Sequence, residues 1–230
     1  MSAWPKWIVG TILVLAAAFV SMVYGLYWQG ASALPRELSR AQHQYSDDVR
    51  GIYWASLGGE GPMRVERLDP LKLCWKVLHA VSIDGREPLG PRASHSLMSE
   101  AARLILSRAR TDSRPANRIV AEIAAMIRLS NEWRPEQIAD YSLDTAWFGR
   151  NARGLRAAAP AYFGVPADRL TRAETIALVG MMKFPSREPM RNREQFNERY
   201  AYLAGELGID PAHIDPQRDL ARLTPAAVTQ

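Results

Sequence analysis

The stretch at residues 153–164, RGLRAAAPAYFG, decides the fold of this chain. Three consecutive alanines at 157–159 precede Pro160, and Tyr-Phe-Gly closes the stretch at 162–164. Alanine favours the helix and keeps its surface narrow, so a neighbouring element can approach closely. Aromatic side chains fill a core, and glycine is common just beyond the C-terminus of a helix. The stretch therefore predicts a short helix that packs tightly against its neighbours.

Helical spacing of apolar residues continues on both sides of this stretch. The pattern predicts helices at residues 69–81, 95–109, 118–130, 134–149, 171–185 and 193–208. Asp69 before Pro70 is typical of a helix N-terminus, and Thr171 with Glu174 fits a capping box. Loops rich in glycine and proline are expected within 51–68 and at 82–94, and a loose tail at 210–230. Because no long stretch alternates with period two, the predicted fold class is mainly α.

Residues 7–28, WIVGTILVLAAAFVSMVYGLYW, carry no charge. At about 1.5 Å per residue, a helix of this length crosses the roughly 30 Å hydrocarbon core of a bilayer. Aromatic residues gather at its two ends, as they do at membrane interfaces. A cleaved signal peptide is the alternative, but the apolar run is long for one and only QGASA at 29–33 resembles a cleavage site. We expect an uncut anchor, whose flanking charges do not settle which side of the membrane holds the domain.

The chain divides accordingly into five parts. We expect a short tail at 1–6, a transmembrane anchor at 7–28, a stalk or first helix at 29–50, a globular domain at 51–208 and a C-terminal tail at 209–230. The net charge of +5 and the pI near 9.5 suit a protein that works beside anionic lipid or an anionic polymer. We expect no nucleic-acid partner, because the chain has no zinc-finger, RNP or recognition-helix signature. The single cysteine, Cys74, excludes an internal disulfide and a cysteine-based zinc site, and its apolar surroundings predict a buried structural thiol.

The text from 134 to 189 resembles the glycosyltransferase family 51 domain of penicillin-binding proteins and monofunctional transglycosylases. SLDTAWFGRNARGLRAAAPAYFGV and LTRAETIALVGMMKFPSREP correspond to that family's YLNxVYFGxGxxGIxxAAxxYFGK and LxLAEAAxLAGLxxxPSxxxP without gaps. The resemblance implies a lysozyme-like, mainly α domain, in which the alanine-rich helix packs behind the active-site cleft. Because these motifs belong to the scaffold, they point to the fold more than to the chemistry. An unrelated helical, membrane-anchored adaptor is the alternative.

Two further family motifs carry the resemblance to residues that could do chemistry. The family's RKxxE corresponds to RIVAE, where Arg118 and Glu122 are kept and Ile119 replaces the lysine. The family's GGSTITQQLAKNL corresponds to ASHSLMSEAARLI, with Ser96 in the place of the threonine and Arg103 in the place of the lysine. In the same alignment His95 replaces the serine, and Ser99 and Glu100 replace the two glutamines. The resemblance implies that Arg103, Arg118, nearby Arg114 and Ser96 bind pyrophosphate and glycan, and that Glu122 is catalytic. Arg118 and Glu122, four residues apart, could also form an ordinary helical ion pair.

The family's first motif departs from its pattern here. Counting back from Asp69, its catalytic glutamate falls on Gly58 and its partner aspartate on Gly59. Glu60 could act as the base if the loop were two residues shorter.

The resemblance implies a reaction in which a carboxylate base activates the 4-hydroxyl of one lipid-linked disaccharide (lipid II), which attacks the anomeric carbon of another. Such base catalysis contributes about 10²–10⁴-fold, and cations take up the charge of the leaving pyrophosphate. A divalent cation, Mg²⁺ or Mn²⁺, is implied by the family alone, and the residues themselves indicate no metal site. Two hypotheses stay open: a divergent peptidoglycan glycosyltransferase that uses Glu60 and Glu122, and an inactive family member that binds lipid II or nascent glycan, or serves other cell-wall synthesis proteins. Either would sit in the inner membrane with its domain on the periplasmic side.

Overall fold

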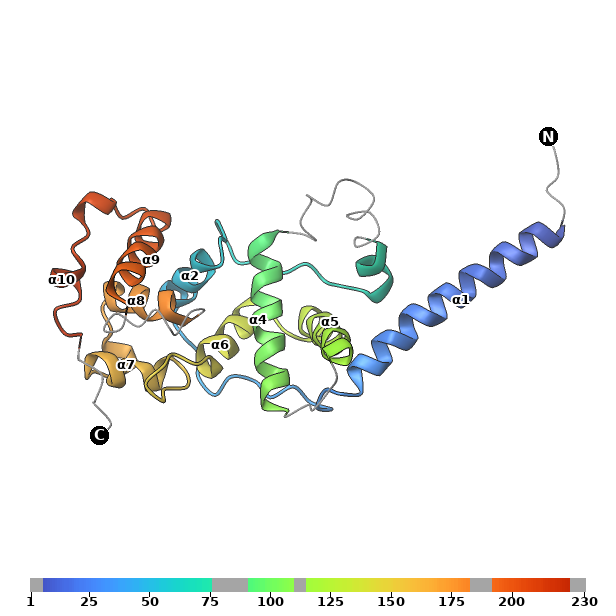
Figure 1. Ribbon diagram of the computed structural model, residues 1–230, viewed down its shortest axis with the longest axis horizontal. Helices are drawn as coiled ribbons and strands as arrows, with labels where there is room; N and C mark the ends of the chain where they lie inside the picture. The colour runs from blue at the N-terminus through green and yellow to red at the C-terminus, as the bar shows by residue number, and fades with distance from the viewer. Residues whose placement is uncertain (1–5, 76–90, 110–114, 183–191, 224–230) are drawn as a thin grey trace.

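A computed structural model describes residues 6–75, 91–109, 115–182 and 192–223 of the chain (Figure 1). Its α-helices are α1 (Lys6–Ala31), α2 (Asp47–Ser56), α4 (Arg92–Arg108), α5 (Pro115–Glu132), α6 (Pro135–Thr145), α7 (Leu155–Phe163), α8 (Arg172–Met182), α9 (Arg193–Glu206) and α10 (Pro216–Asp219). Residues 70–75 are also helical, and two 3₁₀ turns lie at Ala167–Arg169 and Pro211–His213. Within these ranges there is no strand, and Trp147 and Arg153 form an isolated bridge. The predicted mainly α fold class is confirmed.

The alanine-rich helix α7 packs as its sequence predicts. Ala158, Ala159 and Tyr162 are fully buried, and the Tyr162 hydroxyl donates a hydrogen bond of 2.8 Å to the carbonyl of Phe148. Gly164 ends the helix with a left-handed φ of 68°. The aromatic pair therefore closes the core between α7 and the turn that follows α6.

The centre of the domain is α4, which lies across α5 and α6 (Figure 1). Ala101 and Ala102 of α4 and Ala121, Ala124 and Ala125 of α5 are fully buried. Because these side chains are small, the two helix backbones approach closely, and long side chains at neighbouring positions can meet across the contact. This contact positions the candidate site described below.

α1 packs against the domain through its C-terminal part, while the rest of the helix extends away from it (Figure 1). Gly30 lies directly on α5: a Cβ added there would sit 2.4 Å from the carbonyl oxygen of Val120. Gln29 also donates a hydrogen bond of 3.5 Å to Asn117 of α5. The remaining apolar surface of α1 is exposed, with Trp7, Leu13 and Val14 each more than 60% accessible.

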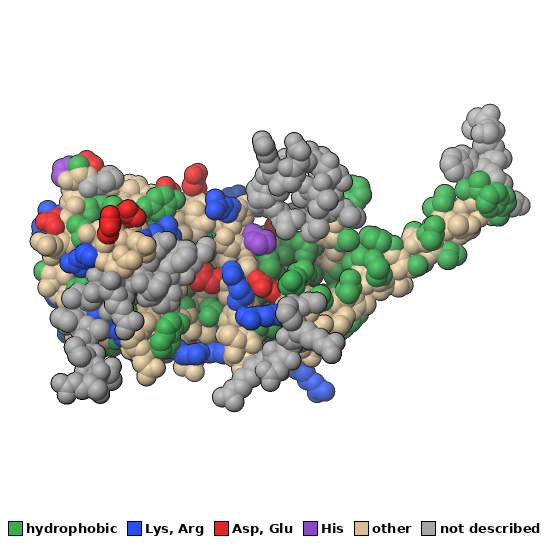
Figure 2. All heavy atoms as spheres, in the orientation of Figure 1, with side chains coloured by type: hydrophobic (Ala, Val, Ile, Leu, Met, Phe, Trp, Pro, Cys, Tyr) green, Lys and Arg blue, Asp and Glu red, His purple; other side chains and the backbone are tan. Residues whose placement is uncertain are grey.

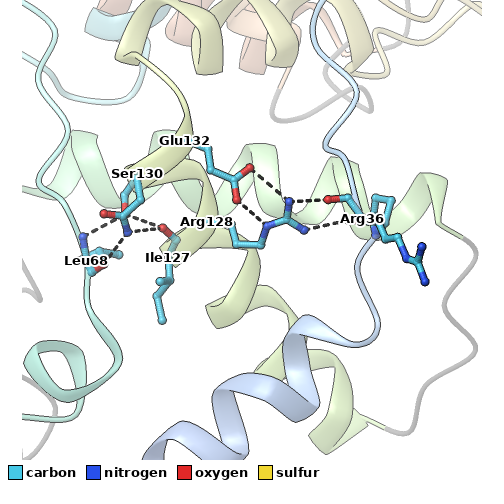
Figure 3. Close-up of polar contacts among 8 residues, drawn as sticks. Arg36, Leu68, Ile127, Arg128, Ser130 and Glu132 are labelled. Carbon is cyan, nitrogen blue, oxygen red and sulfur yellow. Dashed lines mark hydrogen bonds and ion pairs between the residues drawn. The ribbon is translucent and has the colours of Figure 1, made fainter.

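Arg128 of α5 holds the segment that joins α1 to α2 (Figure 3). Its guanidinium donates hydrogen bonds to the carbonyls of Pro35, at 2.8 Å, and Arg36, at 2.9 Å. Glu132, one turn later, accepts from the same guanidinium at 2.8 Å. The segment predicted as a stalk is thus attached to the domain, and Leu34 and Leu38 within it belong to the core.

The next residues of α5 hold the extended segment that leads to residues 70–75. The Leu68 amide donates a hydrogen bond to the Ser130 hydroxyl at 2.9 Å, and Asn131 donates to the Leu68 carbonyl at 2.7 Å (Figure 3). Asp69 then caps the helical residues 70–75, since its carboxylate accepts from the amides of Leu71 and Lys72. The predicted cap is confirmed, while residues 76–81 of that predicted helix lie outside the described ranges.

Three of the helix boundaries that differ from the predicted ones lie in the middle of the domain. α4 begins at Arg92 rather than at 95, so part of the predicted loop at 82–94 is helical. α5 begins at Pro115, three residues earlier than expected. α6 ends at Thr145 rather than at 149, because Gly149, Arg150 and Asn151 adopt positive φ in a turn that pairs Trp147 with Arg153.

The C-terminal residues up to 223 are not a loose tail as predicted. Leu220 is buried, and Arg222 pairs with Glu174, which is itself 2% exposed. Glu174 also accepts from the amide of Thr171, which in turn accepts from the Glu174 amide, so the predicted capping box is confirmed. The predicted division of the chain into five parts stays a prediction.

The burial of Tyr200 on α9 makes stability depend on pH in the alkaline range. Burial raises the pKa of the Tyr200 hydroxyl from 10.0 to about 12, with Asp219 adding to the shift and Arg218 opposing it. The folded state therefore holds a proton that the unfolded state releases first, so stability is full below pH 10 and is lost as the pH rises toward 12. We expect the free energy of unfolding to fall over this range, and to fall less steeply in Tyr200→Phe. Urea titrations at several pH values measure this, and parallel curves for the two proteins would contradict it.

Candidate functional site

A charged cluster lies where α4 crosses α5. The Ser99 hydroxyl donates a hydrogen bond of 2.7 Å to Oε1 of Glu122, and Nε of Arg103 lies 3.6 Å from the same oxygen. Arg103 also donates to the carbonyl of Ser99 at 3.2 Å. The Arg103 side chain is 55% exposed and that of Glu122 is 26% exposed, so both can reach a ligand from solvent. Figure 2 shows acidic and basic side chains gathered in the middle of this face of the domain.

Helical periodicity places the α4 residues of this cluster on one face. Ser96, Ser99, Glu100 and Arg103 follow the i, i+3, i+4, i+7 spacing, which brings their side chains to the same side of a helix. Glu122 reaches the cluster from the facing helix because the buried alanines let α4 and α5 approach closely. The three residues that are linked, Ser99, Arg103 and Glu122, thus bring together one hydroxyl, one guanidinium and one carboxylate.

A buried tyrosine borders the cluster from α2. Tyr53 is 1% exposed, and burial raises its pKa well above the ordinary value; the negative charge of Glu100 adds to the shift. Arg103 opposes the shift, which means that Glu100, Arg103 and Tyr53 lie within electrostatic reach of one another. Sequence reasoning missed Tyr53, since its position in a predicted apolar segment gave no sign that it faces a charged site.

Of the other predicted site residues, Ser96 shares the α4 face of the cluster without a described bond to it, and the rest lie apart from the cluster or outside the described ranges. Arg118 is exposed on α5, one turn before Glu122, and forms no ion pair with any described residue, so the alternative Arg118–Glu122 pair is not formed. Ser96 is half-buried on α4. Arg114 lies outside the described residues. Glu60 is exposed, and no described residue bonds its carboxylate; only its backbone carbonyl accepts, from the Trp54 indole at 3.5 Å.

The loop after α2 is built around glycines where the family pattern has acids. Gly58 follows the C-cap of α2 with a φ of 81°, a backbone conformation that residues other than glycine rarely adopt. At Gly59 a Cβ would lie 2.2 Å from the ring of Trp54, which is itself buried. A glutamate–aspartate pair at these two positions would therefore require the loop and Trp54 to move.

The site does not offer the ligands that the family's divalent cation would take. Mg²⁺ and Mn²⁺ prefer several carboxylate or carbonyl oxygens. In the part of the chain that the structure describes, no three residues among His, Cys, Asp and Glu gather as a metal site. Glu122 is already engaged by Ser99 and Arg103.

Fold and site together define a mainly helical protein whose charged site lies beside one helix long and apolar enough to cross a membrane. Residues 98–207, which run from within α4 to just beyond the end of α9, match the family model described as Transglycosylase. Through this segment, a little under half of the chain, the protein is similar to the transglycosylase family. The resemblance read from the sequence is confirmed.

Individual relatives agree with this assignment at low identity. Penicillin-binding protein 1A of Mycobacterium tuberculosis is 28% identical over 108 residues, which cover 46% of this chain and 13% of the relative. The protein of the same name from Pseudomonas aeruginosa is 28% identical over 109 residues, covering 47% and 13%. A protein of Cupriavidus necator named as a transglycosylase is 30% identical over 142 residues, covering 57% and 60%. The chain thus spans less than two thirds of each of these relatives.

Proposed function

We propose that this chain is a membrane-anchored transglycosylase-family protein that binds lipid II, or the nascent glycan strand, at the Ser99–Arg103–Glu122 cluster. The observation that carries the proposal is the contact between Arg103 and Glu122, two residues that the family motifs place in the substrate site and that lie 3.6 Å apart here. The exposed guanidinium offers donors to a pyrophosphate, and the carboxylate can accept from a sugar hydroxyl.

The proposed location follows from α1. The helical span of 25 residues from Trp7 to Ala31, which is apolar overall, would anchor the chain in the inner membrane. The domain would then lie on the periplasmic side, where lipid-linked precursor is presented. Other cell-wall synthesis proteins are the partners that such a binding module would serve.

The loop after α2 favours binding over polymerisation. A base must lie within hydrogen-bond reach of the hydroxyl that it activates. Gly58 and Gly59 occupy the positions of the family's acids, and the exposed carboxylate of Glu60 contacts no described residue. The second candidate, a glycosyltransferase that uses Glu60 and Glu122, is favoured by one observation: Glu122 is held in a defined position by Ser99 and Arg103.

We expect Arg103→Ala to weaken the affinity for lipid II by about 10–100-fold, since hydrogen bonds to a charged group contribute about 1.5–3 kcal/mol. Titration calorimetry with the detergent-solubilised full chain measures this change. Arg193→Ala is the matched control, because Arg193 is an exposed arginine on α9, and its affinity should equal that of the wild type. A wild-type protein that does not bind lipid II would overturn the proposal.

The polymerisation assay separates the two candidates. Wild type, Glu60→Gln and Glu122→Gln are incubated with lipid II, and the products are resolved by length. Three proteins that bind but form no glycan strand support the binding module. Strands made by the wild type and lost in Glu122→Gln would replace the binding module with the enzyme.

A further inference from the structure

A mostly apolar groove of about 280 Å³ lies between α1, the helical residues 70–75 and α5, and His95 of α4 also lines it. Its walls include Val23 and Leu26 of α1, Leu73, and Val120, Ile123 and Met126 of α5. Figure 2 shows hydrophobic side chains running from α1 onto the adjoining face of the domain. The groove is thus continuous with the apolar surface of the helix proposed to cross the membrane.

The length of α1 indicates where this groove would lie relative to the bilayer. About 20 residues at 1.5 Å each cross the hydrocarbon core, so a span that begins at Trp7 leaves that core near Leu26. Tyr27 and Trp28 then lie at the interface, where aromatic side chains are enriched. Because Val23 and Leu26 line the groove, it opens at the level where the hydrocarbon layer ends.

The rim of the groove on α5 is also apolar and uncovered. Ile119 is 62% exposed and Ile123, one turn later, is 38% exposed. The family motif has a lysine where this chain has Ile119. Gly30 packs on the backbone of Val120, which lies between these two isoleucines in the sequence. This contact places the edge of α5 beside the part of α1 that leaves the bilayer.

We propose that this edge of α5 enters the bilayer beside α1 and that an acyl chain of a membrane phospholipid occupies the groove. Exposed isoleucines beside a membrane helix lose their unfavourable contact with water when they enter the hydrocarbon layer. The groove, at the same depth, is then filled by lipid rather than by water. The inference rests on the membrane anchoring included in the proposed function, but not on the binding of lipid II.

The test places a reporter on the rim and in the groove of the full chain. In a Cys74→Ala background, which removes the only native cysteine and keeps that wall of the groove apolar, Ile119→Cys, Ile123→Cys and Tyr202→Cys are each labelled with the environment-sensitive fluorophore NBD. The proteins are reconstituted in nanodiscs of phosphatidylethanolamine and phosphatidylglycerol that contain doxyl-labelled phosphatidylcholine. Tyr202, 51% exposed on α9 at the far end of the domain from α1 (Figure 1), is the matched control.

We expect the labels at 119 and 123 to be quenched several-fold more strongly than the label at 202. Equal quenching at all three positions would overturn the inference. A blue-shifted but unquenched label at 119 would also overturn it, because a protein surface rather than lipid would then cover the edge. Flotation with vesicles tests the anchoring separately: a protein that floats but stays unquenched refutes this inference alone. Thermal melts followed by circular dichroism check that each variant is folded. If Ile123→Cys does not fold, the comparison of the exposed position 119 with position 202 is sufficient for the test.

Discussion

Asp140→Ala is expected to lower the free energy of unfolding by about 3–5 kcal/mol, because it removes the buried carboxylate of a largely buried guanidinium and leaves only the exposed carboxylate of Asp47 as its partner. Asp140 of α6 receives two hydrogen bonds of 2.8 Å from Arg50 of α2, one from Nε and one from Nη2. The side chains are 5% and 15% exposed, respectively. Asp140 also accepts from the amide of Tyr45 at 3.1 Å, so one carboxylate fixes both α2 and the segment before it. Urea denaturation followed by circular dichroism measures the loss.

Asp47→Ala is the matched control for this prediction. Asp47 pairs with the same Arg50 at 3.0 Å, but its side chain is 97% exposed. Exposed ion pairs contribute about 0–1 kcal/mol, so the stability of this variant should stay close to that of the wild type. Equal losses in the two variants would show that burial of the pair does not determine its contribution.

Gly154→Ala is the second substitution with a large expected effect. Gly154 precedes α7 with φ 78° and ψ 154°, a region of backbone space that is nearly exclusive to glycine. A Cβ there would also lie 2.6 Å from the carbonyl oxygen of Asp144, a backbone atom that cannot swing aside. Backbone strain of about 1–3 kcal/mol and a similar overpacking cost together give an expected loss of about 2–6 kcal/mol in the free energy of unfolding.

The other end of α7 supplies the control. Gly164 has a φ of 68°, but a Cβ there would meet nothing within 4 Å. Gly164→Ala carries only the cost of a left-handed conformation, about 1–2 kcal/mol. The two variants are compared by the same denaturation experiment. A loss at Gly154 no larger than that at Gly164 would mean that the chain before α7 can shift away from Asp144.

The sequence predicted the helices well where local signals are strong. Thr171 and Glu174 mark the start of α8 because both groups of a capping box lie within one turn. The predicted end of α6 was wrong, because Trp147 lies outside the helix and pairs with Arg153 across a turn. Helical periodicity carries no information about that pairing. The buried C-terminal Leu220 was missed for a related reason: it joins a core whose other buried residues all come earlier in the chain, at 34–203.

The site was predicted in part. Alignment with the family motifs brought Arg103 and Glu122 into one site, and the structure places them 3.6 Å apart. It did not predict that Ser99 would donate a hydrogen bond to Glu122. In the alignment a serine replaces a glutamine there, and only the position of the facing helix α5 shows that the serine still reaches the site. Their roles in binding or catalysis stay predictions.

The contact between Gly30 and α5 has a mechanical consequence. Together with the hydrogen bonds from Arg128 to the carbonyls of Pro35 and Arg36, it joins α1 rigidly to the domain, so that no flexible linker separates them. With α1 in the membrane as proposed, the height of Arg103 and Glu122 above the lipid headgroups would be set by the tilt of α1, and extra residues inserted between α1 and α2 would not raise it.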